Sequence, residues 1–466
     1  MRKHMKITIP FIILALSSLL LSCGDKFLDV KPDIHQRVPV SVEDFQALLD
    51  NTITMNQSSC HALGIIGSDD YFVKEAAYQA FPVDLESLYQ KNAYLWAAKI
   101  YSGGETTTID WNIGFLRILS TNLILEGLQK TDPVNTDKKN VAVGSALFHR
   151  ALNYYSLAQL YCVVYNGKTA ENDMGLPLRL SSDVTLNVKR STLKQTYEQI
   201  TSDLVQAERI LPERPLNIFR PGKAAAYSLL SRLSLQKGDY EKVIEYTTKA
   251  LTINRSLNDF NKLVSTPNYS FQANGVGNSE LIFMNSMANL FITNVSYFNA
   301  DESLLNSYEP GDLRKQVYFK SNTNGQQLFM GSYTGNNLYF TGFATDELYL
   351  TRAEGYARTG RLTEALSDIN YLRQNRYTKT ALTDLSSSDK DQVLDWIINE
   401  RRKEMVMRGT RWEDLRRLNK EPIYATTLQR KIGSVDYYLR PNSNRYAWPI
   451  PVDAVERGGY EQNMRD

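Results

Sequence analysis

Two segments of the chain repeat a pattern of helix, glycine turn and second helix. The first spans Ala224–Asn254 and turns at Gly238, and the second spans Glu347–Arg373 and turns at Gly360. Glycine suits such a turn because it adopts the left-handed backbone conformation that ends a helix. Both segments also carry small residues that let two helix axes approach closely: Ala226, Ala250, Ala353, Ala357 and Ala365. The pattern therefore predicts antiparallel helical hairpins.

The two hairpins resemble tetratricopeptide units, in which helical pairs stack into a superhelix. Their turn glycines are 122 residues apart, so the units do not form an uninterrupted array. Apolar residues also recur at helical spacing over 111–128, 145–164 and 192–211. We therefore predict a mainly α fold with a tetratricopeptide-like α–α superhelical scaffold. Generic helical hairpins are the alternative.

The composition changes between the two hairpins. Residues 260–345 contain 15 aromatic residues and 13 Asn, but only nine charged residues and no long helical period. Irregular segments on a rigid scaffold often carry binding sites, so we predict a loop-rich ligand-binding lobe here. A packed β-rich cap without a ligand is the alternative. The lobe would separate two parts of the scaffold, residues 23–259 and 346–466.

The chain starts with MRKHMKITIPFIILALSSLLLSC. Basic residues precede an apolar run, Ile7–Leu21, that is shorter than the roughly 20 residues of a membrane-spanning helix. The run ends at Leu20-Leu21-Ser22-Cys23, which resembles a bacterial lipobox. We expect residues 1–22 to be a lipoprotein signal peptide and Cys23 to be acylated. A cleaved signal peptide with a chance cysteine is the alternative.

Charge and missing motifs exclude several classes of function. Without residues 1–22 the chain has 50 basic and 51 acidic side chains, so it has no net attraction for nucleic acid. It contains no HExxH pair, phosphate-binding loop or G-x-S-x-G elbow. We therefore expect no catalytic residues, metal ligands or cofactor. His149 lies within an apolar helical pattern and is expected in the core.

Two further features are structural in our interpretation. Cys60 and Cys162 are too few for a disulfide framework, and the sequence leaves open whether they pair or stay free. The run Asn399–Asn419 interleaves arginines with acidic residues at helical spacing. It predicts a helix with an ion-pair network, in which Trp412 packs against a guanidinium group.

Several motifs together resemble the SusD/RagB lipoprotein family. They occur in the family's order and span nearly the whole chain: the lipobox with Cys23-Gly24-Asp25-Lys26-Phe27-Leu28-Asp29 and Pro32, ALFHRALNYYSLAQLY before Gly175-Leu176-Pro177-Leu178, Thr192–Pro212, GDYEKVIEY, Glu347-Leu348-Tyr349-Leu350 with Arg352-Ala353-Glu354, ERRKE…GTRWEDLRR, and Trp448-Pro449-Ile450-Pro451. The chain departs from the family at Arg408, usually Glu, and at Arg457-Gly458-Gly459, usually containing Asn-Pro.

The resemblance implies a surface-exposed, lipid-anchored protein of the bacterial outer membrane. Such proteins cover a TonB-dependent SusC-like porter and pass it oligosaccharides or, in RagB-like cases, peptides. It also implies an α-superhelix of four tetratricopeptide-like units with ligand loops on the other side. We expect the helical scaffold, rather than the lobe, to supply most of the contact with the porter.

A sugar-binding site needs exposed aromatic faces and hydroxyl-binding polar groups. Two segments lack helical burial patterns, Asp69–Tyr101 and Phe260–Thr345. We predict Trp96 as the stacking platform, with Tyr101 and Tyr297 beside it and Asp70 accepting sugar hydroxyls. The set is completed by Tyr71, Tyr333 and Tyr339. A core position for Trp96 is the alternative.

The sequence therefore predicts a non-enzymatic glycan-binding protein that serves nutrient uptake. Three alternatives stay open: a peptide-binding RagB-like protein, a surface glycosidase and a tetratricopeptide adaptor without a ligand. The pair Asp69-Asp70 suits acid–base chemistry, hydroxyl binding or a plain turn.

Overall fold

The computed structural model describes residues 38–103, 105, 109–131, 136–263, 269–287, 290–294 and 296–466. The predicted signal peptide and the predicted lipidation site, Cys23, lie outside these residues. Residues 42–466 form one compact unit. Within the described residues, no helix combines the length and the apolar character that crossing a membrane requires.

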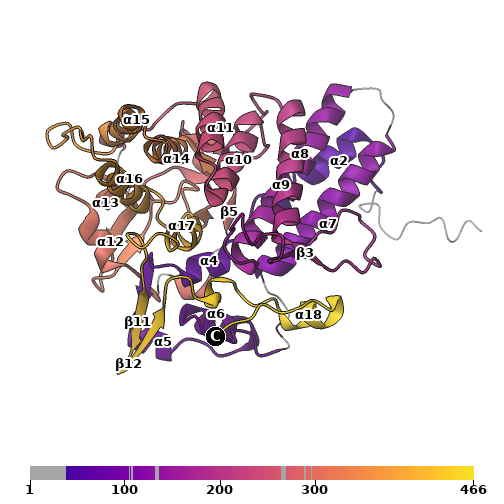
Figure 1. Ribbon diagram of the computed structural model, residues 1–466, viewed down its shortest axis with the longest axis horizontal. Helices are drawn as coiled ribbons and strands as arrows, with labels where there is room; N and C mark the ends of the chain where they lie inside the picture. The colour runs from indigo at the N-terminus through magenta and orange to yellow at the C-terminus, as the bar shows by residue number, and fades with distance from the viewer. Residues whose placement is uncertain are drawn as a thin grey trace, which may run out of the picture. The chain divides into compact units, whose positions relative to one another are not determined.

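Helices packed side by side form the framework, as the sequence predicts. Figure 1 shows them running from α7 and α8 to α15 and α16. Their bounds are α7 Ile109–Gln129, α8 Thr136–Tyr161, α9 Leu193–Ile210, α10 Lys223–Lys237, α11 Tyr240–Ile253, α14 Thr345–Arg358, α15 Leu362–Gln374 and α16 Lys390–Glu404. The mainly α fold class is thus confirmed.

Local sequence determines where these helices begin and end. The Thr192 side chain caps α9 by accepting a hydrogen bond from the Gln195 backbone amide. The Gln195 side chain in turn accepts a hydrogen bond from the Thr192 backbone amide. Gly238, with φ +75°, ends α10, and Gly360, with φ +81°, follows α14. Both turn glycines of the predicted hairpins therefore adopt the left-handed conformation.

The two hairpins are distant in sequence but adjacent in space. Helix α11 of the first packs against α14 of the second. A Cβ atom at Gly355 of α14 would lie 3.0 Å from Ile244 and 3.1 Å from Val243 of α11, so glycine permits the close approach. Arg232 of α10 also pairs with Glu347 of α14 at 2.6 Å. The residues between the hairpins are consequently inserted into a continuous helical row.

The inserted residues form short ladders instead of long helices. Antiparallel pairs join β4 with β10, β5 with β9, and β7 with β8. The bounds are β4 Leu281–Phe283, β5 Ser286–Met287, β6 Phe298–Ala300, α12 Glu302–Ser307, α13 Arg314–Tyr318, β7 Phe319–Ser321, β8 Gln327–Phe329, β9 Tyr339–Phe340 and β10 Phe343–Ala344. Three 3₁₀ turns belong here too: η2 Phe260–Lys262, η3 Ala273–Gly275 and η4 Phe291–Thr293. The lobe boundaries at 260 and 345 stay predictions.

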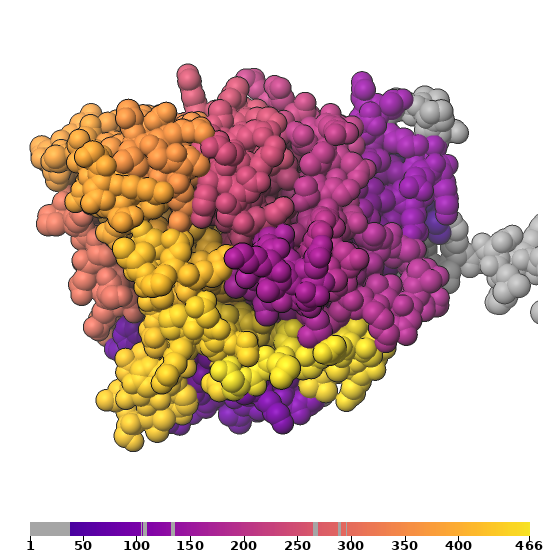
Figure 2. Space-filling view, in the orientation of Figure 1, coloured from indigo at the N-terminus to yellow at the C-terminus, as the bar shows by residue number. Residues whose placement is uncertain are grey.

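The remaining elements come from both ends of the unit. Figure 2 shows the C-terminal residues, in yellow, lying next to purple residues from the N-terminal part. The early elements are α2 Val42–Leu49, α3 Thr52–Met55, α4 Ala62–Gly67, β1 Tyr71–Val73, α5 Glu75–Gln79 and α6 Leu85–Tyr94. The others are β2 Met174–Pro177 paired with β3 Arg190–Thr192, α17 Arg411–Leu418, β11 Leu428–Ile432 paired with β12 Val435–Leu439, η5 Asn444–Tyr446 and α18 Val452–Gly458.

The single helix predicted over Asn399–Asn419 is wrong. The chain breaks between α16 and α17, where Met407 has φ +56° and Gly409 has φ +79°. Trp412 does not pack on a guanidinium group either, because its ring stacks on Trp448 at 5.1 Å. The predicted ion-pair network exists, but many of its bonds reach other elements.

Two further predictions concern buried residues. His149 lies in the core, 1% exposed, with its ring against Phe148 and Phe283, which confirms its structural role. Cys60 and Cys162 are both buried free thiols. The question that the sequence left open is thus answered in favour of unpaired cysteines.

Candidate functional site

A narrow recess opens in the surface of the lobe. Its enclosed volume is small, about 30 Å³, and it is lined by Tyr269, Thr293, Phe298, Leu328, Phe329, Met330, Ser332, Asn336, Asn337 and Tyr339. Its residues come from η4, β6, β8 and β9 and from the loop between β8 and β9. Several short ladders therefore supply the walls, and no single element builds the site.

The loop that carries the recess amides is held by its own hydrogen bonds. Ser332 Oγ donates to the Leu338 carbonyl at 2.6 Å and accepts from the Phe340 amide at 3.0 Å. Asn336 Oδ1 accepts from the Leu338 amide at 2.9 Å. On the opposite wall, the Tyr339 hydroxyl donates to the Thr293 carbonyl at 3.0 Å. The recess is consequently preorganised.

Three aromatic rings gather beside η4, and we call them the aromatic rim: Phe81, Phe291 and Tyr297. Phe81 meets Phe291 and Tyr297 nearly edge-on, with centroids 5.5 and 5.1 Å apart. Phe81 is buried, Tyr297 is half-buried, and Phe291 is 46% exposed. Phe291 and the recess residue Thr293 belong to the same turn, so the rim adjoins the recess along the chain, and we take the two together as the candidate site.

The chemistry of this site is aromatic, amide and hydroxyl. Aromatic faces pack on the C–H groups of a sugar ring, and amides both donate to and accept from hydroxyl groups. The described residues that line the recess include no carboxylate, histidine or lysine. In the described part of the chain, no three His, Cys, Asp or Glu residues are placed to hold a metal ion. The arrangement therefore suits the binding of a ligand that carries hydroxyl groups.

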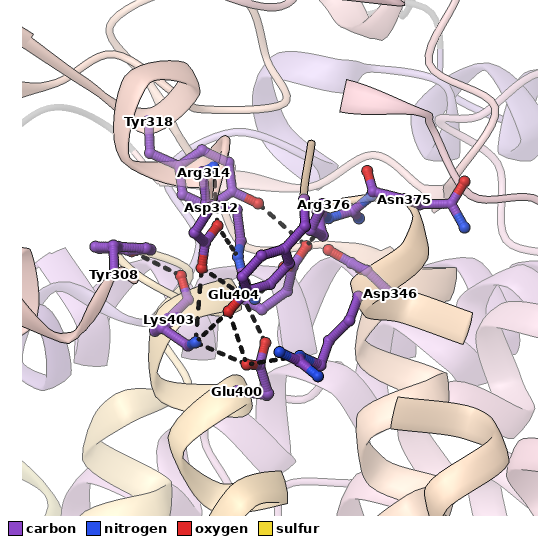
Figure 3. Close-up of polar contacts among 12 residues, drawn as sticks. Tyr308, Asp312, Arg314, Tyr318, Asp346, Asn375, Arg376, Glu400, Lys403 and Glu404 are labelled. Carbon is purple, nitrogen blue, oxygen red and sulfur yellow. Dashed lines mark hydrogen bonds and ion pairs between the residues drawn. The ribbon is translucent and has the colours of Figure 1, made fainter. Parts of the chain in front are cut away.

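A buried ion cluster attaches the lobe to the scaffold. Figure 3 shows Glu400 and Glu404 of α16 beside Arg314 of the lobe and Arg376, which follows α15. Arg314 pairs with Asp312, Glu400 and Glu404 at 2.7, 2.6 and 3.1 Å. Arg376 pairs with Glu404 at 2.8 Å and with Glu280 at 2.7 Å. These charges neutralise one another inside the protein.

Two buried carboxyl groups, those of Glu280 and Asp346, have pKa values shifted in opposite directions. Burial raises the pKa of Glu280 to about 7, although Arg376 opposes the rise. Burial would also raise the pKa of Asp346, but the Arg408 guanidinium outweighs it and holds that pKa below its usual value. Arg408 packs against the rings of both Tyr333 and Phe340, 4.9 and 4.8 Å from their centroids. It thereby fixes the loop that lines the recess.

The prediction that Asp70 accepts sugar hydroxyls is contradicted by its contacts. The Asp70 carboxylate is 1% exposed, pairs with Arg402 and accepts from the Met407 amide at 3.0 Å. Its neighbour Asp69 forms a two-bond pair with Arg411, at 2.7 and 2.8 Å. Both carboxylates therefore tie the chain to the α16–α17 region, and the buried Asp70 is not available to a ligand.

The exposed position predicted for Trp96 is also wrong. Its ring is 1% exposed, its Nε1 donates to the Gly67 carbonyl at 2.9 Å, and the Arg430 guanidinium lies 4.5 Å from the ring centroid. The core position weighed as the alternative is the one observed. Tyr71 is equally buried, because it lies in β1 and stacks on Phe298 at 5.4 Å.

The other predicted tyrosines are divided between core and site. Tyr333 is buried and donates to Glu280 at 2.5 Å, so it belongs to the ion cluster. Tyr101 is half-buried against Tyr89 and does not line the recess. Tyr297 lies in the aromatic rim and Tyr339 in the recess. These two remain candidates for ligand contact.

The structure brings the two predicted segments together. Strand β1 of the first pairs with β6 of the second, with Tyr71 opposite Ala300. Several residues of the site were not predicted individually: Tyr269, Phe291, Phe329, Asn336 and Asn337. The aromatic and Asn content of residues 260–345 identifies the lobe, but sequence alone does not reveal which of its 15 aromatic rings face solvent.

Comparison with known proteins gives consistent results. A family model described as "Starch-binding associating with outer membrane" matches residues 26–235, and a model of the SusD family matches residues 291–464. SusD-like protein P38 of Formosa agariphila is 28% identical over 159 residues, which are 33% of this chain and 28% of that protein. SusD-like protein P2 of the same organism is 29% identical over 114 residues, 24% of this chain and 21% of that protein. The chain thus matches less than a third of each curated relative.

Solved structures share the fold. A SusD superfamily protein of Bacteroides thetaiotaomicron has a TM-score of 0.73 at 22% identity, covering 91% of this chain and 100% of that one. A SusD-like carbohydrate binding protein of Bacteroides vulgatus has a TM-score of 0.66 at 19% identity, covering 90% and 96%. Together with the family models and the motifs in their order along the sequence, these likenesses show that the chain belongs to the SusD/RagB family.

Proposed function

We propose that this protein is a surface-exposed lipoprotein that binds oligosaccharides and delivers them to a TonB-dependent SusC-like porter in the outer membrane. The observation that carries the proposal is the aromatic rim beside an amide-lined recess, on a chain that belongs to the SusD/RagB family. Binding without catalysis is part of the proposal, because the carboxylates nearest to the predicted site are committed to ion pairs.

The direct test is an array of glycans and peptides, probed with a soluble form that lacks residues 1–23. We expect binding to one class of oligosaccharide, with no hydrolysis product after long incubation. Selective capture of peptides would replace the proposal with a RagB-like function. Product formation that disappears when a carboxylate is removed would identify a glycosidase instead. A protein that binds its porter but no array member would be an adaptor.

The proposed location depends on Cys23. Acylation there would hold the protein to the membrane more firmly than the apolar leader alone, since several acyl chains contribute. Cys23→Ala should release the protein from the membrane fraction, whereas Cys60→Ala, which removes another cysteine, should leave it there. Retention of the Cys23→Ala variant through its own leader would argue against acylation.

We propose that the helical scaffold provides most of the porter contact. Apolar side chains exposed on α7 and on the loop between β2 and β3 offer surface for it: Leu116 is 54% exposed and Val184 is 67% exposed. Charged substitutions at these positions should weaken co-purification with the porter, while substitution of Phe291 in the lobe should not. The reverse result would assign the contact to the lobe.

A further inference from the structure

We infer that the lobe site selects uncharged saccharides and rejects glycans that carry carboxylate or sulfate groups. This inference rests on the proposed function, because it names the class of ligand for the same site. It follows from the distribution of charged side chains in and beneath the recess.

The walls of the site contain no ionisable acid or base. Each described residue that lines the recess is an aromatic, aliphatic, hydroxyl or amide residue. The sequence explains this, since Leu281–Ala300 and Ser321–Thr345 contain no Asp, Glu, Lys or Arg. The residues at 264–268, 288–289 and 295, whose structure is not described, are also uncharged in the sequence. The side chains that line the recess therefore offer no opposite charge to a ligand. Lys320 lies opposite Leu328 in the β7–β8 ladder, but it does not line the recess, and its Nζ donates to the Gln316 carbonyl at 3.1 Å.

The cations beneath the recess are already neutralised. Arg408 pairs with Asp346 at 2.5 Å, and Arg376 is shared between Glu280 and Glu404. Both arginines are buried, below the rings of Tyr333 and Phe260 respectively. An anionic sugar would have to give up its hydration without gaining an ion pair, which is costly in a recess of low polarity.

Other recesses of the described surface differ from this one. The recess between α7 and the loop after β2 includes Arg179 and Asp183. The recess between α2 and α8 includes Glu43, Lys138 and Arg220. With 22% charged residues in the chain, charged walls are the ordinary outcome. The neutral walls of the lobe recess thus differ from the charged walls of these two recesses.

The test compares matched ligands that differ only in charge. Oligosaccharide pools from plant and algal polysaccharides are divided, and one half of each acidic pool is carboxyl-reduced or desulfated. Binding to the full chain in detergent is measured by calorimetry at low and high salt. For the backbone that binds, we expect the acidic member to be at least about tenfold weaker than its neutral counterpart. We also expect the neutral affinity to be insensitive to salt, since no ion pair is screened.

A charge placed at the rim provides a second measurement. Asn337 is exposed at the mouth of the recess, and Asn337→Lys should raise affinity for the acidic member at low salt. The matched control is Asn187→Lys, an exposed asparagine in the scaffold loop before β3, which should leave both affinities unchanged. Circular dichroism establishes that both variants are folded.

The outcomes separate the inference from the function. Neutral ligands that bind while their acidic partners do not would support the inference. Acidic members that bind as tightly as neutral ones, or an affinity that falls steeply with salt, would overturn the inference and leave glycan binding intact. If no pool of either kind binds, the proposed function itself fails.

Discussion

At the scale of single residues, exposure decides which aromatic rings are available to a ligand. Composition marks the lobe as rich in aromatic residues, yet most of these rings pack against one another or against arginines. Phe291 differs, because its ring is 46% exposed while it still leans on Phe81. A ring that stacks on a sugar needs this combination: part of its surface is exposed to the ligand, and part packs against a buried residue that holds it in place.

Phe291→Ala should weaken oligosaccharide binding several-fold, because losing a stacking ring at a hot spot costs more than about 1 kcal/mol. Calorimetry with the oligosaccharide found on the array would measure the loss. The matched control is Tyr438→Ala, since Tyr438 is 49% exposed on β12, outside the lobe. Equal affinity for Phe291→Ala and the unmodified protein would remove the aromatic rim from the site.

Trp96→Ala should act on stability. The ring is fully buried, donates to the Gly67 carbonyl and covers the Arg430 guanidinium, so its removal leaves a cavity and an uncovered cation. We expect a loss of about 3–5 kcal/mol in the free energy of unfolding, measured by urea denaturation. A stable variant that has lost only ligand affinity would instead restore Trp96 to the binding site.

The sequence could identify Trp96 as aromatic and flanked by small residues, but its burial depends on a partner 334 positions later, Arg430. The same limit applies to Asp70, whose partner is Arg402. His149 was predictable because its burial follows from neighbours on its own helix. A local sequence pattern carries no information about partners that are distant in the sequence, so burial that depends on them could not be predicted.

At the scale of elements, patterns that depend on near neighbours were reliable. The glycine-turned hairpins and the capped helix α9 formed as predicted, because propensity, periodicity and capping agree there. The run 399–419 was misjudged, since its helical charge spacing continues across a break at Met407–Gly409. Its basic residues satisfy that spacing only in part: Lys403–Glu400 and Arg417–Asp414 pair locally, while Arg402 reaches Asp69 and Asp70.

One loop can be perturbed without touching the rim. Gly335 has φ +67°, and a Cβ atom there would collide with the Gln272 backbone. Gly335→Ala should displace the loop that carries Asn336 and Asn337 and so reduce oligosaccharide affinity. Gly325→Ala is the matched control, because Gly325 has φ +73° but open space around its Cβ position.

Both glycine variants share a backbone cost of about 1–2 kcal/mol from the left-handed conformation. Only the Gly335 variant adds the collision, so the comparison isolates the shape of the recess. Thermal denaturation should show a larger loss for Gly335→Ala. If the two variants bind oligosaccharide equally well, the loop between β8 and β9 does not shape the site.

At the scale of the whole molecule, buried ion pairs join parts that are distant in sequence. Glu354 of α14 illustrates this, because it binds Arg417 of α17 at 2.6 Å and Arg358 at 2.8 Å. Arg358 continues to Glu421 at 2.7 Å. The helical row and the C-terminal segment are therefore held by charge as well as by apolar packing, and their stability should depend on pH.

The direction of that dependence follows from Glu354. Burial alone would raise the pKa of its carboxyl, but Arg417 and Arg358 outweigh burial and lower the pKa to about 2. A carboxyl whose pKa is lower in the folded state stabilises the protein above its unfolded pKa, near 4.5, and loses this contribution as pH falls toward 2. The stabilisation should therefore be complete at neutral pH and should decline below about pH 4.5.

Glu354→Gln should lower the free energy of unfolding by about 3 kcal/mol at pH 7, because it leaves buried guanidinium groups without their carboxylate. The difference between the variant and the unmodified protein should shrink as pH falls from about 4.5 toward 2, because the Glu354 carboxyl takes up a proton in the unfolded state near pH 4.5 but in the folded state only near pH 2. Urea denaturation at several pH values measures it. Glu241→Gln, which removes an exposed ion pair with Arg361, should show little change at any pH. A Glu354→Gln difference that stays constant with pH would mean that this carboxylate is not what couples the scaffold's stability to acid.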